Sequence, residues 1–282
     1  MLAGSISAAG RALHVSQPAI SRVLALTEKR LGYPLFERAR GGLIPTPEAK
    51  RLYAEVEEIY SQVQRVNALA TSLGSEGEGQ LKLISSSSFG QKVVPTALSY
   101  FCAHNRAARL DYRQVTFDQF VSFFLSGQAD IGVSMSAADH PYLSSTRVGQ
   151  EQVVCVIPRA HPLAHSEFIT AEAITASSNW IGYPPNTPMY KALTAFFGAN
   201  GPAVPPSIEV RTPVSAYFFA HRGLGPALVD RSCIAGPSEE LVVRPIDPPA
   251  HIDIWVTRSL LTPLPLLARR FVAALKKSLE ES

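Results

Sequence analysis

The chain has 282 residues, of which 46% are hydrophobic and 17% charged, which is enough for two or three folded domains and excludes a disordered chain. The net charge is only +3, but residues 1–52 carry +5 and the remainder carries −2, so a polyanionic partner would bind the N-terminal segment. The three cysteines are isolated in the sequence, which predicts buried thiols in a reducing cytoplasm. No apolar run reaches roughly 18 residues and no signal-peptide pattern is present, so we expect a cytoplasmic protein with no membrane segment.

Residues 5–31 have the pattern of two short helices joined by a tight turn. Ser16 is placed to cap the second helix, and Pro18 occupies its first turn, where a missing N–H costs nothing. Gln17, Ser21 and Arg22 lie on the outward face and have the amide, hydroxyl and guanidinium groups that pair with base edges in a DNA groove. An ordinary amphipathic helical hairpin with a solvated polar face is the alternative at this point. The inward face of the second helix recurs at intervals of four, three and four residues: Ile20, Leu24, Thr27 and Leu31.

Gly32 is predicted to end this helix in the left-handed conformation. The apolar pairs Leu35-Phe36 and Leu43-Ile44 flank a turn centred on Gly41-Gly42, which predicts a two-stranded wing carrying Arg38 and Arg40. Two arginines beside a recognition helix suit contact with phosphates or with the minor groove. The predicted DNA-binding residues are Ser16, Gln17, Pro18, Ser21, Arg22, Arg38 and Arg40.

These residues together resemble the amino-terminal signature of the LysR-type transcriptional regulators. The resemblance implies a winged helix-turn-helix domain over residues 1–46, double-stranded promoter DNA and a small-molecule effector as ligands, a homodimer or homotetramer, and RNA polymerase as a candidate partner. Family members have a full helix before the residues that are Gly4-Ser5 here, where this chain has only Met1–Ala3, so we expect a misassigned or truncated start. The residues that carry the resemblance are Ala8-Ala9, Leu13, Ser16-Gln17-Pro18-Ala19, Ser21-Arg22, Glu28, Leu31-Gly32, Leu35-Phe36-Glu37-Arg38 and Thr46.

A long helix is predicted from Pro47 to Leu73, before a Gly-rich hinge over 74–79, because no Pro or Gly follows Pro47 within the segment. Its apolar residues repeat every 3.5 positions, as in a two-helix coiled coil, whereas a helix lying on its own domain would drift toward 3.6. We therefore assign residues 47–79 to a linker and dimerisation helix, which would present two recognition helices to a two-fold DNA site. The sequence of residues 44–56 resembles that of the amino-acid- and opine-responsive branch of the family. The seam consists of Leu52, Val56, Ile59, Val63, Val66, Ala70 and Leu73.

Residues 80–282 alternate strand and helix patterns and predict an α/β domain of two lobes, with lobe I over 80–149 and 258–282 and lobe II over 150–257. Helices over 95–104 and 118–126 separate three strands, so the connections are right-handed crossovers in a parallel sheet. Lobe II begins with a strand over 152–157, an antiparallel strand returns over 252–257, and a final helix over 265–279 packs on lobe I. The resemblance implies an effector domain similar to periplasmic solute-binding proteins. The predicted lobe I strands are Leu81–Ile84, Leu110–Val115 and Asp130–Ser134.

Ligands of such sheets bind beyond the carboxyl ends of the strands, which points to the loops that follow them. Four consecutive serines lead toward a helix and could hold an anion, although a flexible polar turn explains them equally well. No Lys or Arg falls on the chosen loops, so neutral donors would hold the anion. Asp118 would bind the ammonium group of a ligand such as an amino acid or a related carboxylate. No other cofactor is expected. The predicted effector-binding residues, the two serines by resemblance, are Ser86, Ser87, Thr116, Ser134, Thr187 and Thr212.

Two other functions are considered. A solute-binding protein without catalytic activity would have the same two lobes, but it would carry a signal peptide and would not need a basic N-terminal segment. An enzyme would need a catalytic motif, and the chain has no nucleophile elbow, Walker loop or zinc-ligand spacing. The sequence therefore predicts no catalytic residue and no metal site, and favours a regulator with a winged helix-turn-helix head, a coiled-coil linker and a two-lobed α/β effector domain.

Overall fold

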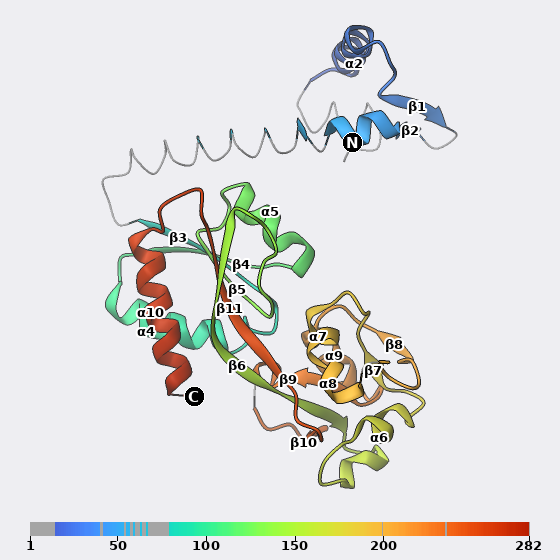
Figure 1. Cartoon of the computed structure of the whole chain (residues 1–282), viewed down its shortest axis with the longest axis vertical. Helices are drawn as coiled ribbons and strands as arrows, with labels where there is room; N and C mark the ends of the chain where they lie inside the picture. Colours follow the sequence, from blue (N-terminus) through green and yellow to red (C-terminus); the bar gives the residue numbers. More distant parts are fainter. Residues whose placement is uncertain are drawn as a thin grey trace. The chain divides into compact units, whose positions relative to one another are not determined.

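The computed structural model describes residues 15–39, 42–53, 55, 56, 59, 63, 66, 79–198, 200–234 and 236–281. The chain divides into two compact units, residues 1–67 and 68–282, which are drawn from blue to red in Figure 1. Within the described ranges, no helix is both long and apolar enough to cross a membrane. The first predicted helix, including Ile6, Ala8, Ala9 and Leu13, lies outside the described residues.

The N-terminal unit contains helix α2 (Gln17–Leu31), whose ends follow from its sequence. Ser16 is the N-cap residue in an extended conformation, and its carbonyl accepts the N–H of Ala19 at 3.0 Å. The Ser16 hydroxyl makes no capping bond, so its expected capping role is limited to the backbone. Gly32 adopts φ 81° and donates its N–H to the Glu28 carbonyl at 2.9 Å, which confirms the predicted left-handed end.

The wing is an antiparallel pair, β1 (Phe36–Ala39) and β2 (Gly42–Pro45), as predicted. Arg38 pairs with Leu43 and Ala39 with Gly42. Gly42 is therefore a strand residue rather than the centre of the turn, and the connection between the strands is residues 40 and 41. Arg40 lies outside the described residues.

Thr46 joins the wing to the linker helix, of which residues 47–53, 55, 56, 59, 63 and 66 are described as helical. Its buried hydroxyl donates to the Pro34 carbonyl at 3.1 Å and accepts the N–H of Ala49 at 3.2 Å. Thr46 is thus the N-cap of the linker helix, and Pro47 follows it in the first turn, where proline is tolerated. Ala70 and Leu73 of the predicted seam lie outside the described residues.

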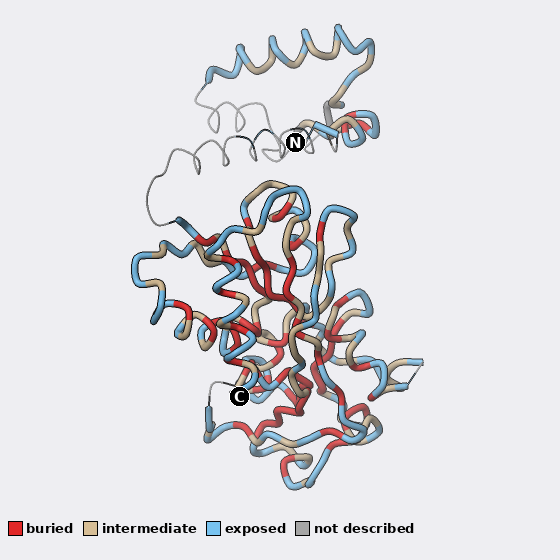
Figure 2. The backbone as a smooth tube through the Cα atoms, turned by 60° about the vertical axis from the view of Figure 1, so that its left-hand side comes forward, coloured by how far each residue is buried: buried red, intermediate tan, exposed pale blue. Residues whose placement is uncertain are grey.

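The larger unit is built on a continuous mixed sheet in the order β4-β3-β5-β11-β6-β9-β7-β8, with β10 also paired to β6 (Figure 1). In lobe I, β3 pairs in parallel with both β4 and β5, which confirms the predicted parallel arrangement. Figure 2 shows buried segments in both lobes of this unit. The lobe I strands are β3 (Gln80–Ser85), β4 (Arg109–Gln114) and β5 (Ile131–Ser134).

One long strand, β6 (Leu143–Pro158), runs from lobe I into lobe II. It pairs antiparallel with β11 (His251–Ser259) as far as Gln152, and with β9 (Ala227–Asp230) from Val153 onward. The predicted strand began only at Gln152, because the polar residues before it lack the apolar pattern of a core strand. That polar half is held by the ladder to β11, which is antiparallel as predicted and also pairs with β5 of lobe I.

Helices of lobe I cover both faces of its sheet. Helix α4 (Val93–His104) packs against the C-terminal helix α10 (Leu266–Glu280), and the rings of Phe101 and Phe271 meet edge to face at 6.2 Å. The 3-10 turn η1 (Phe117–Gln119) and helix α5 (Phe120–Leu125) bring Phe120 and Phe124 into a second buried cluster. Of the cysteines, Cys155 and Cys233 are buried, but Cys102 is exposed on α4, contrary to the expectation for all three.

Lobe II is made of short elements around the end of β6. The segment from Pro188 to Phe197 forms two helices, because the chain turns at Leu193. The short strands are β7 (Ile181–Gly182), β8 (Ile208–Glu209) and β10 (Leu241–Pro245). The helical elements are η2 (Pro162–His165), α6 (Ala171–Thr175), α7 (Pro188–Ala192), α8 (Thr194–Phe197), α9 (Pro213–His221) and η3 (Arg231–Cys233).

Candidate DNA-binding face and interlobe cleft

The outward face of α2 presents the residues that the sequence assigns to DNA. Gln17 and Arg22 are exposed and Ser21 is half-buried, whereas Ile20 and Leu24 on the opposite face are half-buried. Thr27 is also half-buried, but Leu31 in the last turn is 37% exposed, so the inward face is shorter than predicted. Ser16 and Pro18 are exposed at the start of the helix.

The wing is held against α2 by Glu28. Its Oε1 accepts the backbone N–H of Leu35 at 2.6 Å and that of Phe36 at 3.2 Å. Glu28 therefore fixes where the first wing strand starts relative to the recognition helix. This role was not predicted, since a glutamate in a helix is most often a solvated surface residue.

The wing arginines are placed only in part. The backbone of Arg38 lies in β1 opposite Leu43, and its side chain is not among the described ones. Their assignment to phosphates stays a prediction. Two further cations, Lys29 and Arg30, are exposed in the last turn of α2, where they also suit the helix dipole.

A narrow cleft lies between the two lobes of the larger unit, where the loops after β3, β4 and β5 meet the starts of α7 and α9. Its volume is about 60 Å³, room for about four or five water-sized groups. The structure thus brings all six predicted effector residues to one place, although they come from five separate loops. Those lining residues are Ser86, Ser87, Thr116, Ser134, Thr187 and Thr212.

The six hydroxyl groups are not equivalent. Thr187 and Thr212 are N-caps of α7 and α9 and accept the N–H groups of Tyr190 at 3.4 Å and Ser215 at 3.2 Å. Thr116 donates to Gln119 Oε1 at 3.0 Å, and Ser134 to the Ser136 carbonyl at 2.8 Å. These four side chains therefore already have roles in holding the loops.

The serine segment, in contrast, has unused donors. Ser86 Oγ is buried without a hydrogen-bond partner among the described residues. The backbone N–H groups of Ser87 and Ser88 also lack an acceptor in that part of the chain. These groups do not form a helix N-terminus as expected, because turns follow the serines and α4 starts only at Val93. The segment can nevertheless donate hydrogen bonds to a ligand oxygen.

Two charged residues line the cleft from opposite lobes. Asp118 lies on η1 of lobe I, and Arg211 of lobe II directly precedes the N-cap Thr212. The pKa of Asp118 is lowered mainly by the nearby Thr116 side chain, then by a backbone N–H and by the charge of Arg211. The expectation that no cation lies on these loops was wrong, because Arg211 lines the cleft. Its position immediately before Thr212 was the available signal.

A buried carboxylate lies at the end of β9, where lobe II meets the crossing strand. Asp230 is fully buried, accepts a hydrogen bond from Cys233 Sγ at 3.4 Å, and its Oδ1 has no partner among the described residues. Burial raises the pKa of Asp230 to about 6, while hydrogen bonds from Cys233 and Ser88 oppose the rise. The group lies outside the cleft lining.

A winged DNA-binding unit followed by a linker helix and a two-lobed domain with a polar cleft defines a ligand-responsive transcription regulator. Residues 74–280 match the family described as the LysR substrate binding domain, and residues 1–50 match the bacterial regulatory helix-turn-helix protein, lysR family. The chain belongs to the LysR family of transcriptional regulators. The solute-binding alternative is therefore not favoured, and the relatives are regulators rather than enzymes.

Similar curated proteins include the transcriptional activator protein LysR of Escherichia coli, which is 27% identical over 99% of this chain and 90% of its own length. The regulator DgcR of a Pseudoalteromonas species is 27% identical over 89% of this chain and 86% of its own. The octopine catabolism/uptake operon regulatory protein OccR of Rhizobium meliloti is 26% identical over 87% and 81%. All three are similar along both units of the chain.

Solved structures agree on the fold. CbnR, a LysR family transcriptional regulator, superposes with a TM-score of 0.71 at 20% identity, covering 98% of this chain and 94% of its own. The full-length CbnR complex with target DNA gives 0.70 at 20% identity, covering 98% and 95%. This likeness shows that the winged unit and the two-lobed unit both have the LysR-family fold.

Proposed function

We propose that this regulator reads promoter DNA with the exposed face of α2 placed in the major groove. Gln17, Ser21 and Arg22 would contact base edges, because their amide, hydroxyl and guanidinium groups match the donors and acceptors there. The exposure of Gln17 and Arg22 and the charge of +5 on residues 1–52 support this role. Ser16 and Pro18 would approach the backbone at the start of the helix, and Arg38 and Arg40 would contact phosphates from the wing.

Two copies would join along the linker helix. Four seam positions that are described, Val56, Ile59, Val63 and Val66, are 49–65% exposed in a single chain. Apolar side chains at this spacing lose contact with water when a second helix packs against them. A homodimer, or a homotetramer built from two dimers, would present paired recognition helices to a two-fold promoter site.

The effector that the cleft fits best is an amino acid or a closely related carboxylate. The single observation that carries this proposal is that Asp118 and Arg211 line one narrow cleft from opposite lobes. A ligand ammonium group would pair with Asp118, and its carboxylate would pair with Arg211 and accept hydrogen bonds from the segment at Ser86–Ser88. The cleft volume of about 60 Å³ suits the five main-chain heavy atoms of an amino acid.

Binding in the cleft would change the DNA-binding geometry. A ligand that touches both lobes favours one lobe arrangement over another by its difference in affinity for the two. That preference would alter the spacing or angle of the paired heads on DNA and thereby the recruitment of RNA polymerase. The regulator would work in the cytoplasm, and the proposal assigns no catalytic role to any residue.

Calorimetric titration of the full chain with a panel of L-amino acids and N-carboxyalkyl amino acids tests the effector class. For a ligand that binds, Asp118→Asn and Arg211→Gln should each weaken affinity by about tenfold to a hundredfold, because each removes a charged hydrogen bond. Arg222→Gln is the matched control, since Arg222 is exposed at the opposite end of α9.

The 2-hydroxy acid analogue of the same ligand separates the two roles. The unaltered protein should prefer the amino acid, and Asp118→Asn should lose that preference while keeping its dependence on Arg211. If the unaltered protein and Asp118→Asn each bound the amino acid and its 2-hydroxy acid analogue with the same affinity, the placement of the ammonium group would be refuted.

A further inference from the structure

A second hollow lies outside the interlobe cleft, at the hinge where β6 passes from lobe I to lobe II. Its volume is about 520 Å³. Residues 147–151 of β6 form one wall, next to the change of partner from β11 to β9 at Gln152 and Val153. We call this hollow the hinge pocket, and its charged lining residues are Lys92, Arg147, Glu151, Arg231, Lys276 and Glu280.

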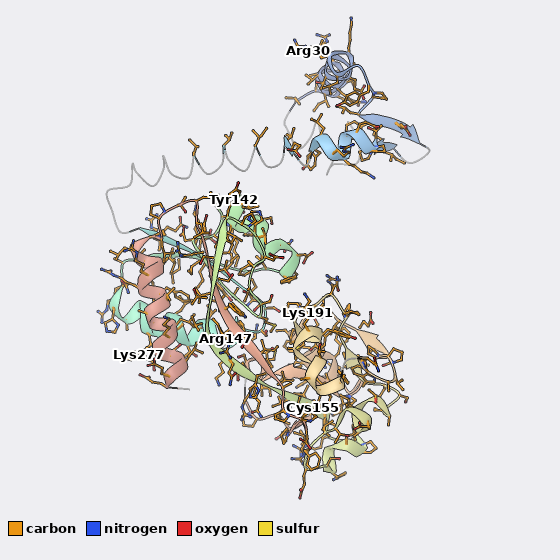
Figure 3. The ribbon with its side chains drawn as sticks, viewed as in Figure 1. Arg30, Tyr142, Arg147, Cys155, Lys191 and Lys277 are labelled. Atoms are coloured by element: carbon orange, nitrogen blue, oxygen red, sulfur yellow. The ribbon has the colours of Figure 1, made fainter. Side chains whose placement is uncertain are left out.

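The hinge pocket collects cations from elements that are far apart in the sequence. Lys92 precedes α4, Lys276 lies on α10, and Arg231 lies on η3 of lobe II. Figure 3 labels Arg147 at the waist of the larger unit, between α10 and the start of lobe II. Both lobes and the strand that connects them therefore contribute positive charge to one concave surface.

Two of the lining residues already have partners. Arg147 forms an ion pair with Asp253 and donates to Gln150 Oε1 at 2.9 Å. Glu151 Oε2 accepts a hydrogen bond from Ser232 Oγ at 2.7 Å. The pair of Arg147 with Asp253 is neutral overall, whereas the hydrogen bond from Ser232 leaves the negative charge of Glu151 in place.

The remaining charges do not cancel. Lys92, Arg231 and Lys276 are exposed, and none of their side chains has an ion pair or hydrogen bond within the described ranges. Glu280 is the other acidic residue of the lining and likewise has no partner there. Three cations without a charged partner face the carboxylates of Glu151 and Glu280, which leaves a net charge of +1 on the lining, and a bound anion would neutralise it.

We propose that the hinge pocket binds a small multivalent anion, a phosphate-bearing or polycarboxylate metabolite, through Lys92 and Lys276 of lobe I and Arg231 of lobe II. This site is separate from the amino-acid cleft and gives the regulator a second input. Because the anion contacts residues on both sides of the hinge, it stabilises the lobe angle at which these cations converge. Occupancy of the pocket then biases the same lobe movement that the cleft effector uses.

Calorimetry on the full chain at low ionic strength, with pyrophosphate and citrate as probes, tests the hinge pocket. We expect at least one probe to bind, and its affinity to fall by about tenfold in Lys276→Gln and in Arg231→Gln. Preference for pyrophosphate or for citrate assigns the site to phosphate-bearing or polycarboxylate ligands. Asp118→Asn should bind the probe normally, which separates this site from the cleft.

Lys277→Gln is the matched control, because it removes the same charge from the next residue of α10, which is not part of the pocket lining. A specific pocket predicts unchanged probe affinity in this variant. Equal weakening by Lys277→Gln and Lys276→Gln would show only general attraction to a basic surface and would overturn the proposal. So would the absence of binding by either probe. Intrinsic fluorescence melting confirms that each variant is folded before titration.

Discussion

The Glu28 side chain accepts the backbone N–H of Leu35 at 2.6 Å and so fixes the first wing strand to the recognition helix. Glu28→Ala leaves this N–H and that of Phe36 without their acceptor, which should cost about 1–3 kcal/mol locally. Faster amide exchange in the peptide over residues 33–37 and weaker binding to promoter DNA are the expected results. Glu37→Ala removes the same charge from the exposed face of β1 and should change neither the exchange nor the wing geometry.

Arg22 and Arg40 should differ in what they contribute to DNA binding. Arg22→Ala should cost about 1–3 kcal/mol on the preferred site and relax base preference, because a base contact is lost. Arg40→Ala should weaken all sequences alike and reduce the slope of log affinity against log salt by about 1. Fluorescence anisotropy with matched and scrambled duplexes over a salt series measures both effects.

Lys191→Ala provides the control for net charge in that series, since Lys191 lies on α7 of lobe II. It should leave both the base preference and the salt slope unchanged. Unaltered sequence preference in Arg22→Ala would remove the base-reading role from this residue.

The LysR-type fold was predictable because its signals are local and periodic. The capping position of Ser16, the left-handed Gly32 and the apolar pairs of the wing each follow from backbone chemistry within a few residues. The parallel strands of lobe I follow from their alternation with helices. Features that depend on distant partners were not predictable: the polar half of β6 is a strand because β11 pairs with it.

The same distinction applies to the candidate site. The loops after parallel strands could be chosen from topology, and the structure brings all six predicted hydroxyl residues together. Their different use could not be foreseen, because the capping bonds of Thr187 and Thr212 depend on where α7 and α9 begin. Arg211 was missed because its neighbour Asp118 lies 93 positions earlier in the chain, on the other lobe.

Charge on the linker seam should separate the two copies. Ile59→Asp and Val63→Asp each place a carboxylate at a position that would be buried between two helices, once per chain. Losing one apolar side chain alone costs about 1.5–3 kcal/mol per copy, so either variant should be monomeric at micromolar concentration. Sedimentation velocity measures the mass, and Val204→Asp, at an exposed site in lobe II, is the control. A dimer that persists in both seam variants would place the interface elsewhere.

Asp230 should make the stability of the larger unit fall as pH rises. Burial raises its pKa in the folded chain to about 6, well above that of an unfolded Asp, so the folded state binds more protons between these two values. Below about pH 4 both states are protonated and the full stability is present. Above pH 6 the folded chain must ionise a buried carboxyl, and a shift of this size costs about 3 kcal/mol.

Urea unfolding of the full chain at about pH 4.5 and pH 7.5 measures this cost. The fluorescence of Trp180 and Trp255, the two tryptophans of the chain, reports on this unit alone. Asp230→Asn should gain stability over the unaltered protein by more at the higher pH, because it removes the group that must ionise. Asp139→Asn, an exposed site, should show the same difference from the unaltered protein at both pH values. A constant difference for Asp230→Asn would mean that its carboxyl does not titrate in this range.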